Sequence, residues 1–210
     1  MTKPVLYGFD GSTYVRTVRA VLHEKGADYD QVPVNVLEGE PRQPEHLARH
    51  PFGKVPVMDI DGMRLLETDA IVRYLDETLP GSSLTPQDAK GRALMTQAIN
   101  LVNNYGYPNL LTCIAQNLFP NLVGGKDPEA HEAALKNSET FLQLLMEKKG
   151  SNAWLAGPDP SLADLMFGPI WFYVTLTPDH ARLNAAPGLE AWWEALQKVP
   201  SFKATEPNLG

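Results

Sequence analysis

Residues 55–71 read VPVMDIDGMRLLETDAI and carry the clearest structural signal in the chain. Two apolar runs, Val55–Ile60 and Met63–Leu66, are separated by Asp61-Gly62, a pair that suits the positive φ angles of a tight hairpin turn. Thr68 then supplies a hydroxyl cap to a segment whose apolar residues recur at helical spacing. The stretch therefore predicts a β-hairpin that leads directly into a helix.

The residues before this hairpin predict two further strands with a helix between them. Val5–Phe9 is a short apolar run, and Tyr29–Val36 alternates in the way that strands do. Ser12 or Thr13 caps the helix that connects these two strands. The proline-rich segment Glu38–Pro51 predicts a loop with one short, irregular helix.

These elements give the order β-α-β-α-β-β-α within residues 1–80, which predicts a small α/β domain. Residues 81–86 are dense in turn-forming residues and are expected to be a linker. Residues 87–210 show helical patterns and no convincing strand, so an all-α domain is expected there.

Capping and proline signals place the helices of this second domain. Gln87–Gln116 predicts a long helix that bends near Gly106-Tyr107-Pro108, because proline removes a backbone donor. Asp127 caps a helix that runs to Gly150. Ser161-Leu162-Ala163-Asp164 has the pattern of a capping box, and Leu189–Val199 predicts a last short helix.

Composition excludes several classes of function. A net charge of −7 without a Lys/Arg cluster argues against nucleic-acid binding. No apolar run reaches the roughly 18 residues that a membrane span needs, and the N-terminus lacks the apolar stretch of a signal peptide. A cytoplasmic protein is therefore expected.

Disulfide and metal sites are not expected either. Cys113 is the only cysteine, which excludes an intrachain disulfide and a thiolate metal cluster. His46 and His50 have a metal-ligand spacing, but Pro51 follows directly and no third ligand accompanies them.

Four motifs, in one order along the chain, resemble the cytosolic glutathione transferases. Tyr7–Thr13, with Arg16 and Val18 after it, resembles the opening of the serine-type classes, phi and theta most of all. His50–Pro56 resembles the phi-class run before the third strand. Ile60–Ile71 resembles the family's hairpin and third helix, and Trp154–Asp164 its helical-domain signature. The resemblance covers nearly the whole chain and implies a thioredoxin-like domain, an all-helical domain and glutathione as co-substrate.

The resemblance implies that Ser12 activates the thiol of glutathione. A thiol of pKa about 8.5 needs a drop of roughly two units, or about 2.7 kcal/mol, to be mostly thiolate at neutral pH. A hydrogen bond to a charged group is worth about 1.5–3 kcal/mol, and a helix N-terminus adds about 0.3–2 kcal/mol. From the residues alone, Ser12 is a plain helix cap, and Tyr7 is a rival donor at the end of the first strand.

The same resemblance implies how glutathione is held. Val55 offers its backbone to the cysteinyl part, before a Pro56 that is cis in the family. Glu67 and Thr68 begin the third helix, where an anion site for the γ-glutamyl carboxylate is expected. Candidates for the glycyl carboxylate are Lys54 and Arg42, although Pro41 replaces a glutathione-binding histidine of the phi class.

Two further sets of residues are expected to complete the enzyme. The electrophile pocket is assigned to aromatic and apolar candidates, namely Phe9, Tyr14, Tyr107, Cys113, Phe167 and Trp171. For Cys113, a buried apolar role is the alternative. Phe52 lies three positions before Val55, as does an aromatic residue that projects into the partner subunit in dimeric relatives, so a homodimer is expected. The alternative is a Phe52 ring folded back under its own loop.

Three functions remain open on the sequence. The resemblance favours an enzyme that conjugates glutathione to small hydrophobic electrophiles. A non-catalytic glutathione-binding or interaction protein of the same fold is the first alternative. A glutathione-dependent peroxidase or reductase is the second, although a reductase needs a cysteine where the chain has Gly11-Ser12-Thr13.

Overall fold

The computed structural model describes residues 2–208, and the chain divides into two compact units. The first unit holds the chain up to Ser83 together with the segment from Val199 onward, and the second unit holds Leu84–Lys198. All strands of the 4-stranded sheet lie in the first unit. The second unit, all of whose residues are described, contains helices and no strand. The predicted fold class, a thioredoxin-like α/β part followed by an all-α part, is confirmed.

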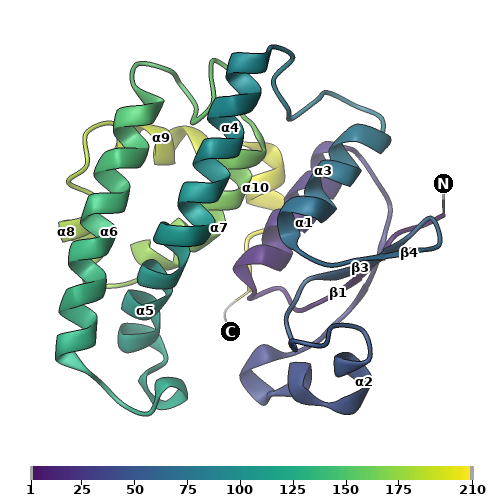
Figure 1. Cartoon of the computed structure of the whole chain (residues 1–210), viewed down its shortest axis with the longest axis horizontal. Helices are drawn as coiled ribbons and strands as arrows, with labels where there is room; N and C mark the ends of the chain where they lie inside the picture. The colour runs from purple at the N-terminus through teal and green to yellow at the C-terminus, as the bar shows by residue number, and fades with distance from the viewer. Residues whose placement is uncertain (1, 209–210) are drawn as a thin grey trace. The chain divides into compact units, whose positions relative to one another are not determined.

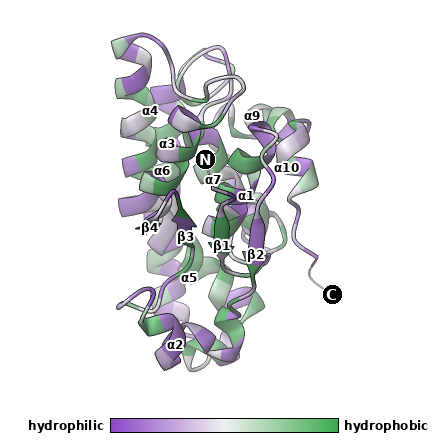
Figure 2. Ribbon diagram, turned by 90° about the vertical axis from the view of Figure 1, so that its right-hand side faces the viewer, coloured by the Kyte–Doolittle hydropathy of each residue, from purple (hydrophilic) through white to green (hydrophobic). Residues whose placement is uncertain are grey.

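The sheet of the first unit has the strand order β2-β1-β3-β4. Strand β1 (Val5–Tyr7) pairs in parallel with β2 (Asp30–Val32) and antiparallel with β3 (Val57–Ile60), which pairs antiparallel with β4 (Met63–Leu65). The first two strands are shorter than the sequence predicts. Figure 2 shows β1 in hydrophobic green and the edge strand β2 partly in hydrophilic purple, as expected for a central and an edge strand.

The hairpin between β3 and β4 has the predicted tight turn. Asp61 and Gly62 have φ angles of 50° and 76°, the left-handed pair that a two-residue turn of this type requires. Asp61 also accepts a hydrogen bond from the Tyr74 hydroxyl at 2.9 Å, which ties the turn to the following helix. The local signal and the structure agree here.

Helices α1 (Thr13–Glu24) and α3 (Thr68–Thr78) lie side by side against one face of the sheet (Figure 1). The predicted loop between β2 and β3 contains two 3-10 turns, η1 (Val36–Glu38) and η2 (Glu40–Arg42), and the short helix α2 (Pro44–Leu47). The core between the sheet and these helices includes fully buried apolar side chains: Leu6, Val18, Leu22, Met58, Ile71 and Leu75.

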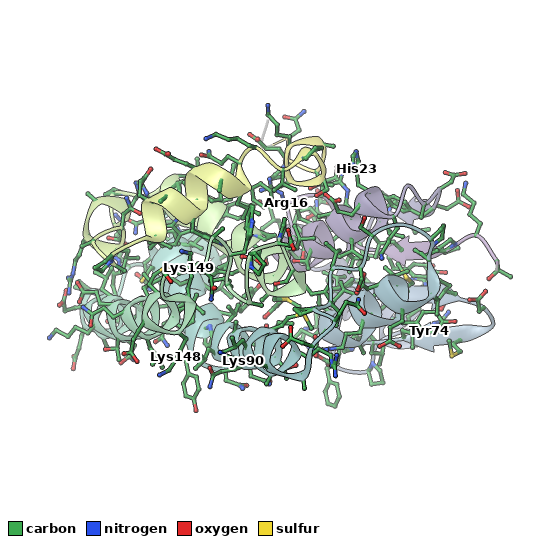
Figure 3. The ribbon with its side chains drawn as sticks, turned by 90° about the horizontal axis from the view of Figure 1, so that it is seen from above. Arg16, His23, Tyr74, Lys90, Lys148 and Lys149 are labelled. Carbon is green, nitrogen blue, oxygen red and sulfur yellow. The ribbon has the colours of Figure 1, made fainter. Side chains whose placement is uncertain are left out.

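The end of the chain returns to the first unit, which corrects the expected domain limit of 87–210. Helix α10 (Pro200–Ala204) contacts α1. Arg16 of α1, labelled in Figure 3, is 1% exposed and donates to the Phe202 carbonyl oxygen at 2.9 Å. Its guanidinium also lies 3.9 Å from the centre of the Phe202 ring. The sequence predicts no helix after Val199, and local patterns do not indicate the distant surface on which this segment packs.

The second unit begins with a long helix that changes its winding midway. Helix α4 (Ala89–Leu101) passes through the π-helical segment η3 (Val102–Gly106) into α5 (Tyr107–Leu118). A Cβ atom on Gly106 would lie 2.5 Å from the Phe141 ring, so glycine is needed for the close approach of the next helix. The sequence predicts a bend at Gly106-Tyr107-Pro108, and the structure has a π-helical segment that ends at Gly106, just before Pro108.

The remaining elements of this unit are the 3-10 turn η4 (Pro120–Val123) and four helices. These helices are α6 (Pro128–Lys149), α7 (Leu162–Thr175), α8 (His180–Leu183) and α9 (Leu189–Leu196). Asp127 caps α6 as predicted. Among the described residues, no helix is both long and apolar enough to cross a membrane.

The core of the second unit is organised around the start of α7. Ser161 and Asp164 form the predicted capping box. The fully buried Asp164 carboxylate also accepts hydrogen bonds from Leu155 N at 3.0 Å and from Trp192 Nε1 at 2.8 Å. Phe167, one turn further along α7, stacks on the Trp192 ring at 4.8 Å. This helix is therefore fixed to α9 by both polar and aromatic contacts.

Candidate active site

The register of the sheet brings three separate segments to one end of the first unit. Tyr7, the last residue of β1, pairs with Val57, the first residue of β3. The loop that leads to Ser12 therefore leaves the sheet at the same end at which the Val55-Pro56 peptide enters it. Strand β4 runs antiparallel to β3. The last residue of β4, shortly before Glu67, therefore lies at the same end of the sheet. The starts of α1 and α3 and the Val55-Pro56 peptide thus lie at one end of the sheet.

Ser12 is the N-cap of α1, with extended φ and ψ angles of −78° and 126°. Its Oγ accepts a hydrogen bond from Val15 N at 3.4 Å. A hydroxyl has one donor and two acceptor positions, so this cap leaves the O–H proton of Ser12 for another acceptor. The first turn of α1, fully described, contains no acidic side chain to offset the positive end of the helix dipole. The two roles considered for Ser12, helix cap and donor, are therefore compatible.

The rival donor, Tyr7, is directed elsewhere. Its hydroxyl donates to Asp59 Oδ2 at 3.1 Å, and the Arg49 guanidinium lies 4.5 Å from its ring centre. Asp59 also binds Arg64 through two contacts of 2.7 Å. Arg64, and to a smaller extent Tyr7, hold the pKa of Asp59 below its usual value despite partial burial. The Tyr7 hydroxyl is thus part of a polar contact between β1 and β3.

Glu67, rather than Thr68, occupies the N-cap position of α3, which corrects the predicted cap. Glu67 has φ 68° and ψ 120°, a backbone conformation that residues other than glycine rarely adopt. Its side chain makes no capping hydrogen bond to the helix. Thr68, 8% exposed, is the first helical residue. Such strain is typical of functional sites and costs about 1–3 kcal/mol. The start of α3 therefore lacks a side-chain cap of its own, and the Glu67 carboxylate is exposed beside it.

The Val55-Pro56 peptide bond is cis, as the resemblance implies. Pairing between β3 and β1 ends at Val57 and Tyr7. Val55 therefore lies just beyond the paired part of the sheet, where an extended peptide can continue the strand pairing. Val55 is half-buried and Pro56 is buried.

Two buried histidines hold the loop before this peptide, a role that the sequence analysis missed. His46 Nε2 donates to the Lys54 carbonyl oxygen at 2.8 Å, and His50 Nδ1 accepts from Phe52 N at 3.3 Å. Each is 2% exposed. Burial lowers the pKa of His50, which the Glu67 carboxylate partly opposes. The four-residue spacing of these histidines was a usable signal, since it places both rings over one loop.

The two candidates for the glycyl carboxylate are both near this loop. Arg42 Nη1 donates to the Phe52 carbonyl oxygen at 3.4 Å, and Lys54 has an exposed side chain. Gly53, with φ 58°, separates them, and a Cβ atom there would lie 2.7 Å from the Pro41 carbonyl oxygen. The Pro41-Arg42 segment thus packs closely against Gly53, and the Arg42 guanidinium lies at the same loop as the Lys54 ammonium group.

Not all residues expected in the electrophile pocket are accessible. Phe9, Tyr14 and Tyr107 are half-buried. Phe167 and Trp171 are 0% exposed in the core of the second unit, with ring centres 5.9 Å apart, so their assignment to the pocket is corrected. Helix α7 is apolar on nearly all sides, as buried helices are. Cys113 is 1% exposed, and burial raises the pKa of its thiol to about 11, which suits the buried alternative.

Phe52 is 73% exposed. Its ring centre lies 6.2 Å from that of His50, edge to face. The alternative of a ring folded under its own loop is therefore wrong.

Comparison with known proteins identifies the family. The family model of the glutathione S-transferase N-terminal domain matches residues 6–83, and that of the C-terminal domain matches residues 105–200. Glutathione S-transferase F13 of Arabidopsis thaliana is 31% identical over 208 residues, which cover 97% of this chain and 95% of the relative.

Solved structures agree with this match. Glutathione transferase F7 of Populus trichocarpa superposes with a TM-score of 0.87 at 30% identity, covering 96% of this chain and 97% of the other. Glutathione S-transferase I of maize, in complex with an atrazine glutathione conjugate, superposes with a TM-score of 0.84 at 29% identity, covering 98% and 97%. The chain belongs to the glutathione S-transferase family and is an enzyme of that family.

Proposed function

We propose that the chain conjugates glutathione to small hydrophobic electrophiles and that Ser12 stabilises the attacking thiolate. The observation that carries this proposal is the position of Ser12 at the N-terminus of α1, with its proton available while its oxygen caps the helix. A charge-assisted hydrogen bond of about 1.5–3 kcal/mol, together with the helix dipole, matches the roughly 2.7 kcal/mol that thiol ionisation requires. The proposed step uses no metal and no general base.

The tripeptide would bind along the three segments at the end of the sheet. Its cysteinyl part pairs with the Val55 backbone, which places the sulfur near Ser12. Its γ-glutamyl carboxylate binds at the start of α3, at Thr68 and the helix amides, while Glu67 pairs with its amino group. Arg42 and Lys54 are the cations for the glycyl carboxylate.

One relative and two aromatic side chains support the choice of a hydrophobic second substrate. The maize structure contains a glutathione conjugate of atrazine, and the half-buried rings of Phe9 and Tyr14 in the first unit suit an apolar electrophile. We place the activity, and hence a detoxifying role, in the cytoplasm, because the chain uses a single cysteine and the co-substrate is a reduced thiol.

Two assays separate this proposal from its alternatives. Retention on immobilised glutathione followed by turnover of chloro-dinitrobenzene supports the transferase. Retention without turnover of this or any other electrophile would favour a non-catalytic binding protein. With glutathione saturating, Ser12→Ala should reduce turnover at least tenfold, equivalent to about 1.4 kcal/mol, and Tyr7→Phe should leave it nearly unchanged.

We also propose that the protein is a homodimer in which Phe52 enters the partner subunit. An aromatic ring that is 73% exposed on a loop has little core of its own to enter. Burying it is worth about 1.5–3 kcal/mol, and a twofold interface gains this contribution twice.

A further inference from the structure

A second cluster of potential ligands lies in the second unit, outside the residues assigned to glutathione. Cys113 on α5, His131 on α6 and Asp179 at the N-cap of α8 come from three separate elements. One possible ligand atom from each lies within 4.8 Å of those from the other two. The three residue types are thiol, imidazole and carboxylate, which are the protein ligands that zinc uses.

The carboxylate at the centre of this cluster is already oriented. Asp179 Oδ2 lies 2.7 Å from His131 Nε2. It also accepts a hydrogen bond of 2.7 Å from Asn117 Nδ2, which donates in addition to the Cys113 carbonyl oxygen at 2.9 Å. Hydrogen bonds from outside the ligand set, such as those of Asn117, are how proteins fix the orientation of metal-binding side chains.

A buried hydroxyl lies beside Cys113 and can donate to a metal-bound sulfur. Ser138 is 0% exposed, and within residues 2–208 its Oγ makes no hydrogen bond of ordinary length and angle. The nearby acceptor is the sulfur of Cys113. A metal-bound thiolate accepts such a bond better than a thiol does, so a bound cation would satisfy a hydroxyl that is otherwise poorly paired.

The geometry requires only small movements to hold an ion. Around tetrahedral zinc, sulfur, nitrogen and oxygen ligands lie roughly 3.3–3.6 Å from one another, given metal–ligand distances of about 2.0–2.3 Å. The sulfur must therefore approach by at most about 1.2–1.5 Å, and the close His131–Asp179 pair must open by about 0.6 Å. The side chains of His131 and Asp179 are 24% and 12% exposed, which gives an ion a route from solvent to the buried sulfur.

We propose that Cys113, His131 and Asp179 bind one Zn²⁺ ion, with a water molecule in the fourth position. Cys113 loses its thiol proton to solvent, His131 binds through a neutral nitrogen and Asp179 binds as the carboxylate. Two negative ligands then balance the +2 charge, so the largely buried site is neutral as a whole. The ion joins α5, α6 and the start of α8, and it overturns the expectation that the chain has no metal site.

Cobalt spectroscopy on the full-length protein tests this proposal. The protein is first freed of metal with a chelator and then titrated with Co²⁺. Because Cys113 is the only cysteine in the chain, a sulfur-to-cobalt charge-transfer band can arise from this site alone. We expect that band, with the strong visible absorption of tetrahedral cobalt, at one ion per chain, and we expect Zn²⁺ to abolish it by displacement. A wild-type protein without the band at saturating Co²⁺ would overturn the proposal, whatever any variant does.

Substitutions then test the ligand set. His131→Asn and Asp179→Asn should each weaken Co²⁺ binding at least tenfold, and Cys113→Ser should abolish the charge-transfer band. His23→Asn is the matched control, because His23 is exposed on α1 in the first unit (Figure 3), and it should bind cobalt as the wild type does. Unchanged affinity in both the His131 and Asp179 variants would contradict the assignment, as would an equal loss in the His23 control.

Discussion

The helices α3 and α7 begin in opposite ways. At the start of α7, Ser161 and Asp164 close the helix with their own side chains, and the Asp164 carboxylate is fully buried. At the start of α3, Glu67 adopts a left-handed backbone, provides no side-chain cap and remains exposed. Every helix leaves orphan N–H groups at its start. A start that the protein closes itself stabilises the fold, whereas one left open is available to a ligand.

The largest effect should follow from opening the closed start. Asp164→Ala would leave the Trp192 indole N–H and the Leu155 amide N–H buried without an acceptor, since both now donate to this carboxylate. We expect a loss of about 3–5 kcal/mol in the free energy of unfolding, measured by urea denaturation. Asp159→Ala, at an exposed position nearby, is the control and should cost little. A loss below about 1 kcal/mol for the Asp164 variant would show that the closed start is not a stabilising feature.

At the open start, the same kind of change should affect binding instead of folding. Glu67→Ala should weaken glutathione binding by about 1.5–3 kcal/mol, the value of a hydrogen bond to a charged group, as measured by titration calorimetry. The free energy of unfolding should change little, because the Glu67 side chain caps nothing. Glu77→Ala, exposed on the same helix, is the control. If the affinity of the Glu67 variant stayed at the wild-type value, Glu67 would have no place in the site.

The exposed loop near the open start provides a third test. Phe52→Ser should shift the protein toward monomer at low micromolar concentration, because each interface loses two buried rings worth about 1.5–3 kcal/mol apiece. Analytical ultracentrifugation measures this shift. Leu122→Ser removes an apolar side chain that is 58% exposed in the second unit and should leave the association unchanged. A wild-type protein that sediments as a monomer at every concentration would refute the dimer, and a Phe52 variant that stays dimeric would refute the role of Phe52.

The smallest effect concerns the buried histidine beneath that loop. Burial lowers the pKa of His50 below its ordinary value near 6.5, so the unfolded chain binds this proton more readily than the folded one. The contribution of this pKa difference to the free energy of unfolding is complete above about pH 6.5 and is lost as the pH falls below that value. His50→Asn retains an acceptor for Phe52 N but does not titrate. The drop in melting temperature between pH 7.5 and pH 5.5 should therefore be smaller in this variant, and an equal drop would show that His50 does not contribute.

Much of the first unit could be predicted because its signals are local. Asp61-Gly62 has few alternatives to a tight turn, and Ser12 precedes a segment with helical periodicity, so the hairpin and the start of α1 follow from neighbouring residues. The resemblance added the cis bond before Pro56, which is present.

What could not be predicted depends on distant contacts. The return of α10 to the first unit rests on the contact between Arg16 and Phe202, which lie 186 residues apart. The left-handed backbone of Glu67 depends on how β4 turns into α3, not on its own residue type. The burial of Phe167 and Trp171 could have been predicted, because α7 is apolar on nearly all sides, as buried helices are. Their aromatic side chains instead led to their assignment to the electrophile pocket.

The pKa of the glutathione thiol in the binary complex tests the central claim most directly. Thiolate absorbance is titrated with pH for the wild type, Ser12→Ala and Tyr7→Phe, each saturated with glutathione. We expect a wild-type pKa roughly two units below the free value of about 8.5, a rise of about one unit or more in Ser12→Ala, and no change in Tyr7→Phe. An unchanged pKa in Ser12→Ala with a raised pKa in Tyr7→Phe would contradict the account and assign the activation to Tyr7.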